Sequence, residues 1–213
     1  MNTYPRLVVM DVDSTLITAE VIELLAARAG SLEVVADITD RAMRGELDFT
    51  ESLRSRVSTL AGLPESVFAE VLAEVELTPG AEDLIAELGR HGCAVGLVSG
   101  GFIEVVAPLA ERLGIPRARA NALKVARGAL TGRVAGEVID RAVKARTLRE
   151  WAAADGIDLA ETVAIGDGAN DLDMLATAGF GIAFNAKPVV AAQADAAVNG
   201  RLDAVLALPP FAA

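Results

Sequence analysis

The stretch LVVMDVDSTLI, residues 7–17, decides the fold because a short apolar run leads directly into acidic residues. Its first four residues are of the kind that favours a buried strand. Asp11 and Asp13 follow at once, and in an extended chain two residues spaced in this way point to the same face. Two carboxylates about 4 Å apart repel by roughly 4 kcal/mol at an effective dielectric constant near 20. We therefore expect a bound cation, a shared proton or exposure to solvent at this strand end.

Two later stretches repeat the pattern of an apolar run, small or polar residues and then a helical pattern. They are AVGLVSGGF (94–102) and TVAIGDGAND (162–171), and two further strands are expected in GFGIAFNAKP (179–188) and DAAVNG (195–200). Strands that alternate with helices predict an α/β fold with a doubly wound, Rossmann-like parallel sheet. In such sheets ligands bind at the carboxyl ends of the strands, so the polar residues after all three runs should face one crevice. A separate hairpin is expected in LKVARGALTGRV (123–134).

The segment between the first two strands has no strand pattern and contains four helical patterns with start and stop residues. It predicts a small helical bundle inserted into the sheet domain. The expected division is an α/β core formed by residues 1–17 and 77–213 and a helical cap formed by residues 18–76. The sequence TPG (78–80) is the expected hinge.

The charge of the chain limits the class of its partners. With 30 acidic and 19 basic side chains the net charge is −11, which argues against binding to nucleic acid or to an anionic membrane surface. No apolar run approaches the roughly 18 residues of a membrane span, and the N-terminus does not resemble a signal peptide, so a cytoplasmic protein is expected. A small-molecule substrate is the expected partner, and monomer and homodimer both stay open. One cysteine and one histidine exclude a disulfide framework and a Cys/His zinc site.

Carboxylates at two strand ends point to a hard divalent cation. Asp11 and Asp13 alone could belong to a turn or a helix cap. Asp167 also follows a strand, and Asn170 and Asp171 would lie on the same side of the first helical turn after it. Oxygen ligands of this kind favour Mg²⁺.

The remaining strand end offers groups that bind anions. Ser99 and Gly100 precede a helical pattern and present a hydroxyl and free backbone N–H groups, although glycines are more often simply turn residues. Lys144 could be an ordinary solvated helix residue, but a phosphate beside carboxylates needs a fixed cation in addition to the metal. Together these residues describe phosphoryl transfer with a carboxylate nucleophile.

The motifs DVDST, SGG, Lys144 and GDGANDLDM resemble, in order and spacing, the four motifs of the haloacid dehalogenase-like superfamily in its phosphatase branch. Two aspartates separated by one residue distinguish that branch. A helical insertion directly after the first motif is similar to the small-cap type of the superfamily. The cap stretch AMRGELDFTESLRSRV (42–57) gives a closer resemblance, to the phosphoserine phosphatase family.

This resemblance implies hydrolysis of O-phospho-L-serine with Mg²⁺ as cofactor. Asp11 is the implied nucleophile and Asp13 the implied acid and base. The implied metal ligands are Asp11, the backbone carbonyl of Asp13, and Asp167, with Asp171 supporting them. The implied substrate contacts are Glu20, Met43, Phe49 and Arg56 in the cap and Ser99, Gly100, Lys144 and Asn170 in the core.

Helical geometry supports Arg56 but does not single it out, because Arg28 also falls on the apolar stripe of its own helix. On a helix that advances about 100° per residue, Arg56 falls inside the apolar stripe of its segment, whereas Arg54 points elsewhere. A cation in an apolar stripe must extend to solvent, form a pair or bind a ligand. The stripe consists of Phe49, Leu53, Val57 and Leu60.

Other functions stay open at this point. Within the same chemistry, the chain could act on another small phosphomonoester such as phosphohomoserine, or pass phosphate to an alcohol. A receiver-type signalling domain also combines an acidic cluster, Mg²⁺, a hydroxyl residue and a lysine, but it needs no helical insertion. A metal-binding structural protein without any reaction is the third alternative.

Overall fold

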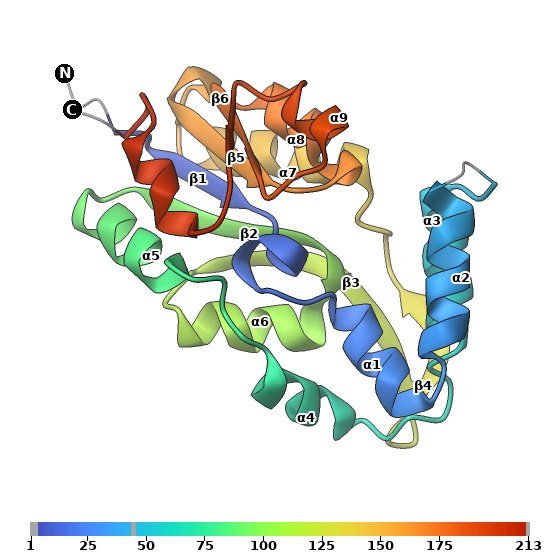
Figure 1. Ribbon diagram of the computed structural model, residues 1–213. Helices are drawn as coiled ribbons and strands as arrows, with labels where there is room; N and C mark the ends of the chain where they lie inside the picture. Colours follow the sequence, from blue (N-terminus) through green and yellow to red (C-terminus); the bar gives the residue numbers. More distant parts are fainter. Residues whose placement is uncertain (1–3, 44–45, 212–213) are drawn as a thin grey trace.

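The computed structural model describes residues 4–43 and 46–211, which form a twisted sheet flanked by helices (Figure 1). The seven strands are β1 (Leu7–Met10), β2 (Ala94–Phe102), β3 (Arg117–Ala126), β4 (Ala129–Ala135), β5 (Thr162–Gly166), β6 (Phe180–Phe184) and β7 (Ala196–Val198). Their order across the sheet is β4-β3-β2-β1-β5-β6-β7. All neighbours are parallel except the edge pair β3 and β4. The prediction of a doubly wound α/β sheet is therefore confirmed.

The first apolar run becomes the central strand of this sheet. All four residues of β1 are buried, and β1 pairs with β2 on one side and with β5 on the other. Because side chains alternate along a strand, Val8 and Met10 join one hydrophobic core while Leu7 and Val9 join the other. Burial on both faces explains why the run is continuously apolar.

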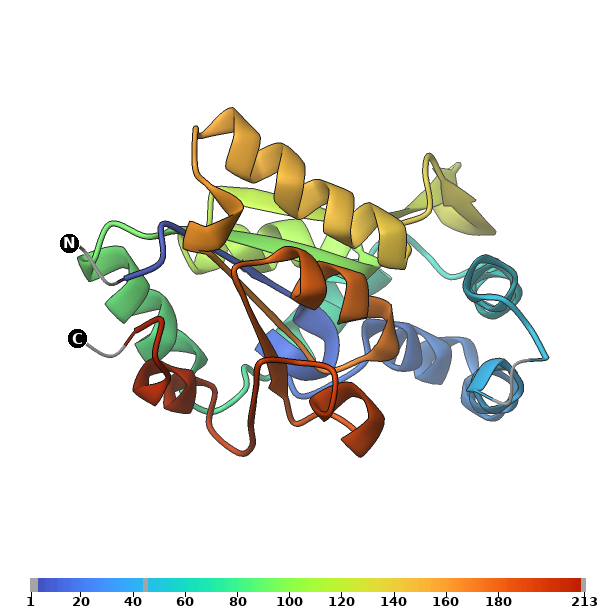
Figure 2. The same cartoon turned by 90° about the horizontal axis from the view of Figure 1, so that it is seen from above.

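Helices cover the two faces of the sheet (Figure 2). The helices that follow the insertion are α5 (Ala81–Arg90), α6 (Ile103–Arg112), α7 (Arg141–Ala154), α8 (Leu172–Thr177) and α9 (Pro188–Ala191). Helices α5 and α6 contribute to the core that contains Val8, whereas α7 and α8 contribute to the core that contains Leu7. No helix in residues 4–43 and 46–211 is long and apolar enough to cross a bilayer.

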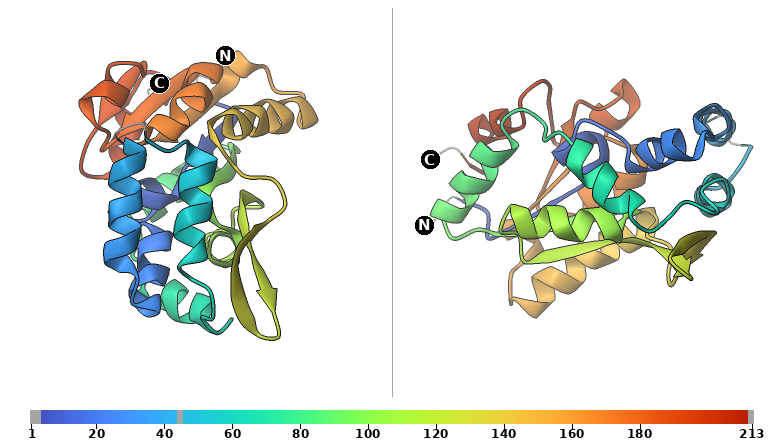
Figure 3. Two further views of the ribbon diagram at one scale, coloured as in Figure 1. Left: turned by 90° about the vertical axis from the view of Figure 1, so that its right-hand side faces the viewer. Right: turned by 90° about the horizontal axis from the view of Figure 1, so that it is seen from below.

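The insertion contains four helices in the described residues: α1 (Val21–Ala29), α2 (Leu32–Met43), α3 (Phe49–Ser58) and α4 (Val67–Glu74). Helices α2 and α3 lie side by side at one end of the molecule, and α3 also contacts β4 at the edge of the sheet (Figure 3). Helix α4 also packs against α6 of the core, so the insertion and the core share an apolar contact. That residues 18–76 behave as a separate domain stays a prediction.

The hairpin differs from the sequence expectation in its connections. We expected a separate hairpin, but its first strand, β3, also pairs with β2 and so extends the main sheet. Its turn reaches the insertion, where the Leu130 amide donates to the Leu63 carbonyl at 2.8 Å and the Gly62 amide donates to the Leu130 carbonyl at 2.9 Å. The Glu65 amide also donates to Gly128 at 2.9 Å. These backbone bonds tie the loop after α3 to the core hairpin.

Candidate active site

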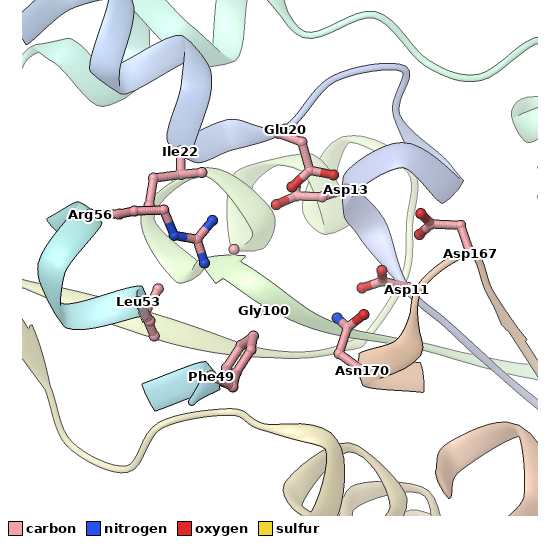
Figure 4. Close-up of a pocket in the computed structure, with 11 residues that line it drawn as sticks. Asp11, Asp13, Glu20, Ile22, Phe49, Leu53, Arg56, Gly100, Asp167 and Asn170 are labelled. Atoms are coloured by element: carbon pink, nitrogen blue, oxygen red, sulfur yellow. The ribbon is translucent and has the colours of Figure 1, made fainter. Parts of the chain in front are cut away.

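The carboxyl ends of β1, β2 and β5 meet on one side of the sheet and bring the polar residues that follow them together (Figure 4). Asp11 follows β1 directly, and its amide donates to the Ile165 carbonyl of β5 at 2.9 Å. Asp167 follows β5, and Gly100 lies near the end of β2. A pocket of about 100 Å³ is lined by residues of all three strand ends and of the helical insertion.

The chain makes a tight turn after Asp11, and within this turn Asp13 keeps an extended conformation with a φ of −63° and a ψ of 131°. Residues 12–16 form a single tight turn in which Ser14 has a φ of 57°. The turn directs two hydroxyls to acidic partners. Thr15 donates to Asp167 Oδ1 at 3.1 Å, and Ser14 donates to Glu20 Oε1 at 2.7 Å. The turn therefore links the end of β1 both to the end of β5 and to the start of α1.

Lys144 of α7 is fully buried between two carboxylates. Its Nζ donates to Asp11 Oδ1 at 2.7 Å and to Asp171 Oδ1 at 2.6 Å. Because a lone buried ammonium ion is strongly unfavourable, these two partners are needed for its burial. The two carboxylates raise the pKa of Lys144 above its usual range although burial opposes them. The alternative that Lys144 is a solvated helix residue is therefore wrong.

The acidic groups at the strand ends hold protons more strongly than usual. Burial and then the neighbouring Asp171 carboxylate raise the pKa of Asp11 well above its usual value. Burial, followed by Glu20, does the same for the pKa of Asp13. Burial and Asp171 raise the pKa of Asp167 to about 6. Lys144 alone does not offset this concentration of negative charge.

Three of these carboxylates could bind a metal ion. Asp11, Asp167 and Asp171 each offer an oxygen, and these oxygens lie within 4.8 Å of one another. Asp171 has both oxygens engaged, one by Lys144 and the other by the Gly168 amide at 3.0 Å. Within the described residues, one oxygen of Asp11 accepts from Lys144 and one oxygen of Asp167 accepts from Thr15. Asp13 Oδ1 is buried without a hydrogen-bond partner. All of these donor atoms are oxygens, and the carboxylates carry more negative charge than Lys144 offsets. The set therefore fits a hard divalent cation.

The end of β2 forms the part of the pocket for which the sequence predicts anion binding. The fully buried Ser99 accepts a hydrogen bond on Oγ from the Gly101 amide at 2.7 Å. Gly100 and Gly101 both line the pocket. A β-carbon at Gly101 would lie 2.7 Å from Asp13 Oδ2, so this position requires glycine for the Asp13 carboxyl to approach the loop.

The helical insertion closes the pocket from the opposite side, as Figure 4 shows. Phe49, Leu53 and Arg56 come from one face of α3, and Glu20 and Ile22 come from the start of α1. Burial lowers the pKa of Arg56, whose guanidinium nevertheless remains charged. Its Nε–H donates to the Ser52 carbonyl at 3.4 Å, and no ion pair within the described part of the chain holds it.

The structure brings most of the predicted site residues to this pocket. Ser99 and Lys144 lie directly behind it, next to Gly100 and Asp11 respectively. Met43 is the last residue of α2, and its side chain lies outside the described part of the structure. The pocket-lining residues among the predictions are Asp11, Asp13, Glu20, Phe49, Arg56, Gly100, Asp167 and Asn170.

Four residues around the pocket are not among the predicted site residues. Leu53 belongs to the apolar stripe that contains Arg56, and Gly101 belongs to the SGG motif, so both had a signal in the sequence. Thr15 belongs to the DVDST motif, but its hydrogen bond to Asp167 left no signal, and Ile22 had none because its position follows from the tight turn after β1.

The chain is similar to known proteins over most of its length. Residues 8–176 match the model of the haloacid dehalogenase-like hydrolase family. A phosphoserine phosphatase of Streptococcus thermophilus is 54% identical over 91% of this chain and 90% of its own length. One of Streptomyces coelicolor is 62% identical over 95% of this chain but only 50% of its own length. The chain thus spans about half the length of that relative.

Solved structures agree with the sequence matches. A phosphoserine phosphatase described as a phospho-aspartyl intermediate analogue has a TM-score of 0.90 and 43% identity, with 96% of this chain and 98% of that chain covered. A substrate-bound phosphoserine phosphatase complex has the same TM-score of 0.90 and 43% identity, with 95% and 97% covered.

Proposed function

The chain belongs to the haloacid dehalogenase-like hydrolase family, and from this premise we propose that it hydrolyses O-phospho-L-serine to L-serine and phosphate with Mg²⁺ as cofactor. The observation that carries the proposal is that residues of the α/β core and residues of the helical insertion face each other across one pocket. The core side offers acidic groups, amide donors and a buried lysine for phosphoryl transfer. The cap side offers a guanidinium and a carboxylate, which match the carboxylate and ammonium groups of an amino acid.

In the first step, we propose, an oxygen of Asp11 attacks phosphorus and the bond between phosphorus and the serine oxygen breaks. Asp13 is protonated at this stage, in agreement with its raised pKa, and it donates its proton to the departing oxygen. Lys144 holds Asp11 in one orientation and partly offsets the charge of the phosphoryl group. The product of this step is an aspartyl-phosphate and free serine.

In the second step, Asp13 takes a proton from a water molecule, and the water oxygen attacks phosphorus. The bond to Asp11 breaks, phosphate leaves and both carboxyl groups return to their starting state. The Ser99 hydroxyl and the Gly100 amide bind the phosphoryl oxygens during both steps. Mg²⁺ held by a side-chain oxygen of Asp11, the backbone carbonyl of Asp13, and Asp167 would neutralise charge on the phosphoryl group.

The cap residues provide selectivity in this proposal. Arg56 binds the substrate carboxylate, Glu20 binds the ammonium group, and Phe49 forms an apolar wall that helps to exclude water, a role that the family resemblance also implies for Met43. Asn170 contacts the substrate from the core, and Asp171 keeps Lys144 in place. The hydrogen bond from Ser14 fixes the orientation of Glu20.

The main experiment is a panel of phosphate-release assays. The substrates are L-phosphoserine, phosphothreonine, phosphohomoserine and a generic aryl phosphate, each assayed with Mg²⁺ and with a chelator. We expect the highest kcat/KM for L-phosphoserine and loss of activity with the chelator. A preference for phosphohomoserine, or phosphorylated product in the presence of an acceptor alcohol, would contradict the proposed substrate or reaction. A lasting phosphoprotein without turnover would favour a receiver-type domain.

A further inference from the structure

Asn121 of β3 is a fully buried polar residue outside the pocket that joins two parts of the catalytic machinery. Its Nδ2 donates to the Gly100 carbonyl at 2.8 Å. Its Oδ1 accepts a hydrogen bond from the Ile139 amide, also at 2.8 Å. The three residues come from separate segments, so one side chain connects the end of β2 to the approach to α7.

The first bond compensates for an irregular stretch of sheet. The parallel pairing of β2 with β3 is regular up to Val98 and resumes at Phe102 with a shifted register. Residues 99–101 of β2 lie inside this irregular stretch, where no regular pairing with β3 fixes their peptide groups. The side-chain amide of Asn121 therefore gives the Gly100 carbonyl a hydrogen bond that the strand pairing does not provide.

This bond also determines which way one peptide group points. A β-carbon at Gly100 would lie 3.5 Å from Phe49 and 3.8 Å from Asn170, so that side of Gly100 faces the pocket. The Gly100 carbonyl instead points to the buried Asn121. A rotation of this peptide would release its oxygen toward an already acidic pocket, where it would repel a phosphoryl group.

The second bond acts on the element that carries the lysine. Ile139 precedes Asp140, whose side chain caps α7 by accepting from the Val143 amide at 2.9 Å. Lys144 is the next residue of that helix and donates to Asp11 and Asp171. Asn121 thus fixes the start of α7 against the same loop that borders the pocket.

We propose that Asn121 is a positioning residue for phosphoryl transfer, which holds the backbone of residues 99–101 and the ammonium group of Lys144 at a fixed separation. The inference rests on the proposed function. In this proposal Asn121 does not contact the substrate. It concerns the rate of the chemical step, because the groups that Asn121 positions face the phosphoryl group, whereas the amino acid part of the substrate is bound by the cap.

The test is Asn121→Leu, which preserves the shape of the side chain and removes both hydrogen bonds. We expect kcat for L-phosphoserine to fall about 10- to 100-fold, as is typical when a partner behind the catalytic groups is lost. KM should change less than about threefold, because α3 and Glu20 are untouched. Asn121→Ala leaves room for a bridging water, and its kcat should lie between those of Asn121→Leu and the unchanged protein.

Thr162→Val is the matched control. Thr162 is equally buried, and its hydroxyl also bonds two backbone groups, the Leu159 carbonyl at 2.7 Å and the Gly179 amide at 3.2 Å. It lies at the start of β5, at the opposite end of the strand from Asp167. We expect a comparable loss of thermal stability in this variant with an unchanged kcat.

Folded Asn121 variants with kcat within about threefold of the unchanged protein would overturn the inference, and so would an equal loss of kcat in Thr162→Val. If neither Asn121 variant folds, as judged by circular dichroism, Asn121 is a structural residue and the inference is wrong. The same variants are assayed with the aryl phosphate. If the protein turns over only that substrate, the proposed substrate fails while the role of Asn121 is still measured.

Discussion

Arg56 is the residue that most directly tests the proposed substrate. It is a partly buried cation on an apolar face of α3, without an ion pair in the described part of the chain. We expect Arg56→Ala to lower kcat/KM for L-phosphoserine by about 30- to 150-fold, because a charged hydrogen-bonding partner contributes about 2–3 kcal/mol. Hydrolysis of an aryl phosphate should change little.

The control for this variant lies two residues away. Arg54 is on the same helix, is exposed and does not line the active-site pocket, so Arg54→Ala should leave both activities unchanged. Steady-state kinetics with the two substrates separates the outcomes. An equal loss for both substrates in Arg56→Ala would show that Arg56 does not recognise the serine carboxylate.

Asp11 allows activity and stability to be separated at one position. Burial and Asp171 raise its pKa, which means that the charged form is unfavourable in the metal-free protein. Asp11→Asn removes that charge, while Asp171 remains as a partner of Lys144. We expect a folded protein with a metal-free Tm no lower than before and turnover reduced by at least about 10³-fold. Thermal unfolding and phosphate release measure the two effects, and substantial turnover would disprove the nucleophile assignment.

At the scale of single residues, the sequence indicated candidate site residues. It did not indicate the residues that hold them in place by hydrogen bonds. Asp11 and Asp167 were accessible from the sequence because they directly follow strands, where parallel sheets bind ligands, whereas Lys144, within α7, was identified mainly from the family resemblance. Thr15 and Asn121 were not, since each acts through a hydrogen bond to a residue distant in the chain. A threonine or an asparagine within an ordinary segment carries no sign of its partner.

At the scale of elements, the contact between α3 and the core hairpin controls where Arg56 lies. Gly132 in β4 has a φ of 72°, and a β-carbon there would meet the Ser58 carbonyl and Ala61 at 3.0 Å. Gly132→Ala should push the end of α3 away from the hairpin. We expect KM for L-phosphoserine to rise about three- to tenfold, because the guanidinium and Phe49 move with the helix.

Gly128→Ala is the control that separates the effect of an unfavourable φ from the effect of steric contact in Gly132→Ala. Gly128 lies in the same hairpin with a φ of 75°, and a β-carbon there meets nothing within 4 Å. Both variants should lose about 1 kcal/mol of stability from the unfavourable φ, but only Gly132→Ala should change KM. Urea unfolding and steady-state kinetics measure these quantities. A similar KM effect in both variants would contradict the packing explanation.

Helices and strands were more predictable than the contacts between them. The strands appeared in the sequence as short apolar runs followed by polar residues, and the four inserted helices appeared through their periodicity. The attachment of the hairpin to the loop at residues 62–65 was not visible, because backbone hydrogen bonds between distant segments leave no pattern in side chains. The packing of α4 on α6 was missed for a related reason, since an apolar face does not reveal which surface covers it.

At the scale of the whole molecule, topology determined the position of the site. A parallel sheet with crossover helices places the carboxyl ends of β1, β2 and β5 on one side, and this single rule brought three sequence-distant motifs together. The excess of negative charge in the whole chain, −11, is also present in the pocket, where the acidic groups outnumber the two cations, Lys144 and Arg56. The fold therefore creates a site that is electrostatically unfavourable without a bound cation.

This imbalance predicts how stability depends on pH and Mg²⁺. In the folded, metal-free protein Asp167 has a pKa of about 6, and the pKa values of Asp11 and Asp13 are also raised. The unfolded chain releases these protons at lower pH. The folded state therefore binds more protons, and its stability must fall as pH rises from about 4 through the raised pKa values. We expect the Tm of chelator-treated protein to be several degrees lower at pH 8 than at pH 6.

Mg²⁺ should reverse this loss, and more strongly at pH 8, where protons no longer compete for the carboxylates. At a concentration 100 times the Kd, a bound ion stabilises the folded state by about 2.7 kcal/mol, which corresponds to roughly 5–10 °C for a chain of this size. Differential scanning fluorimetry at both pH values, with and without Mg²⁺, measures the effect. NaCl at matched ionic strength is the control, since general screening of the surface charge would raise Tm without a specific site. If NaCl stabilises as much as Mg²⁺, or if the Mg²⁺ effect is equal at both pH values, the acidic groups at the three strand ends do not bind the cation.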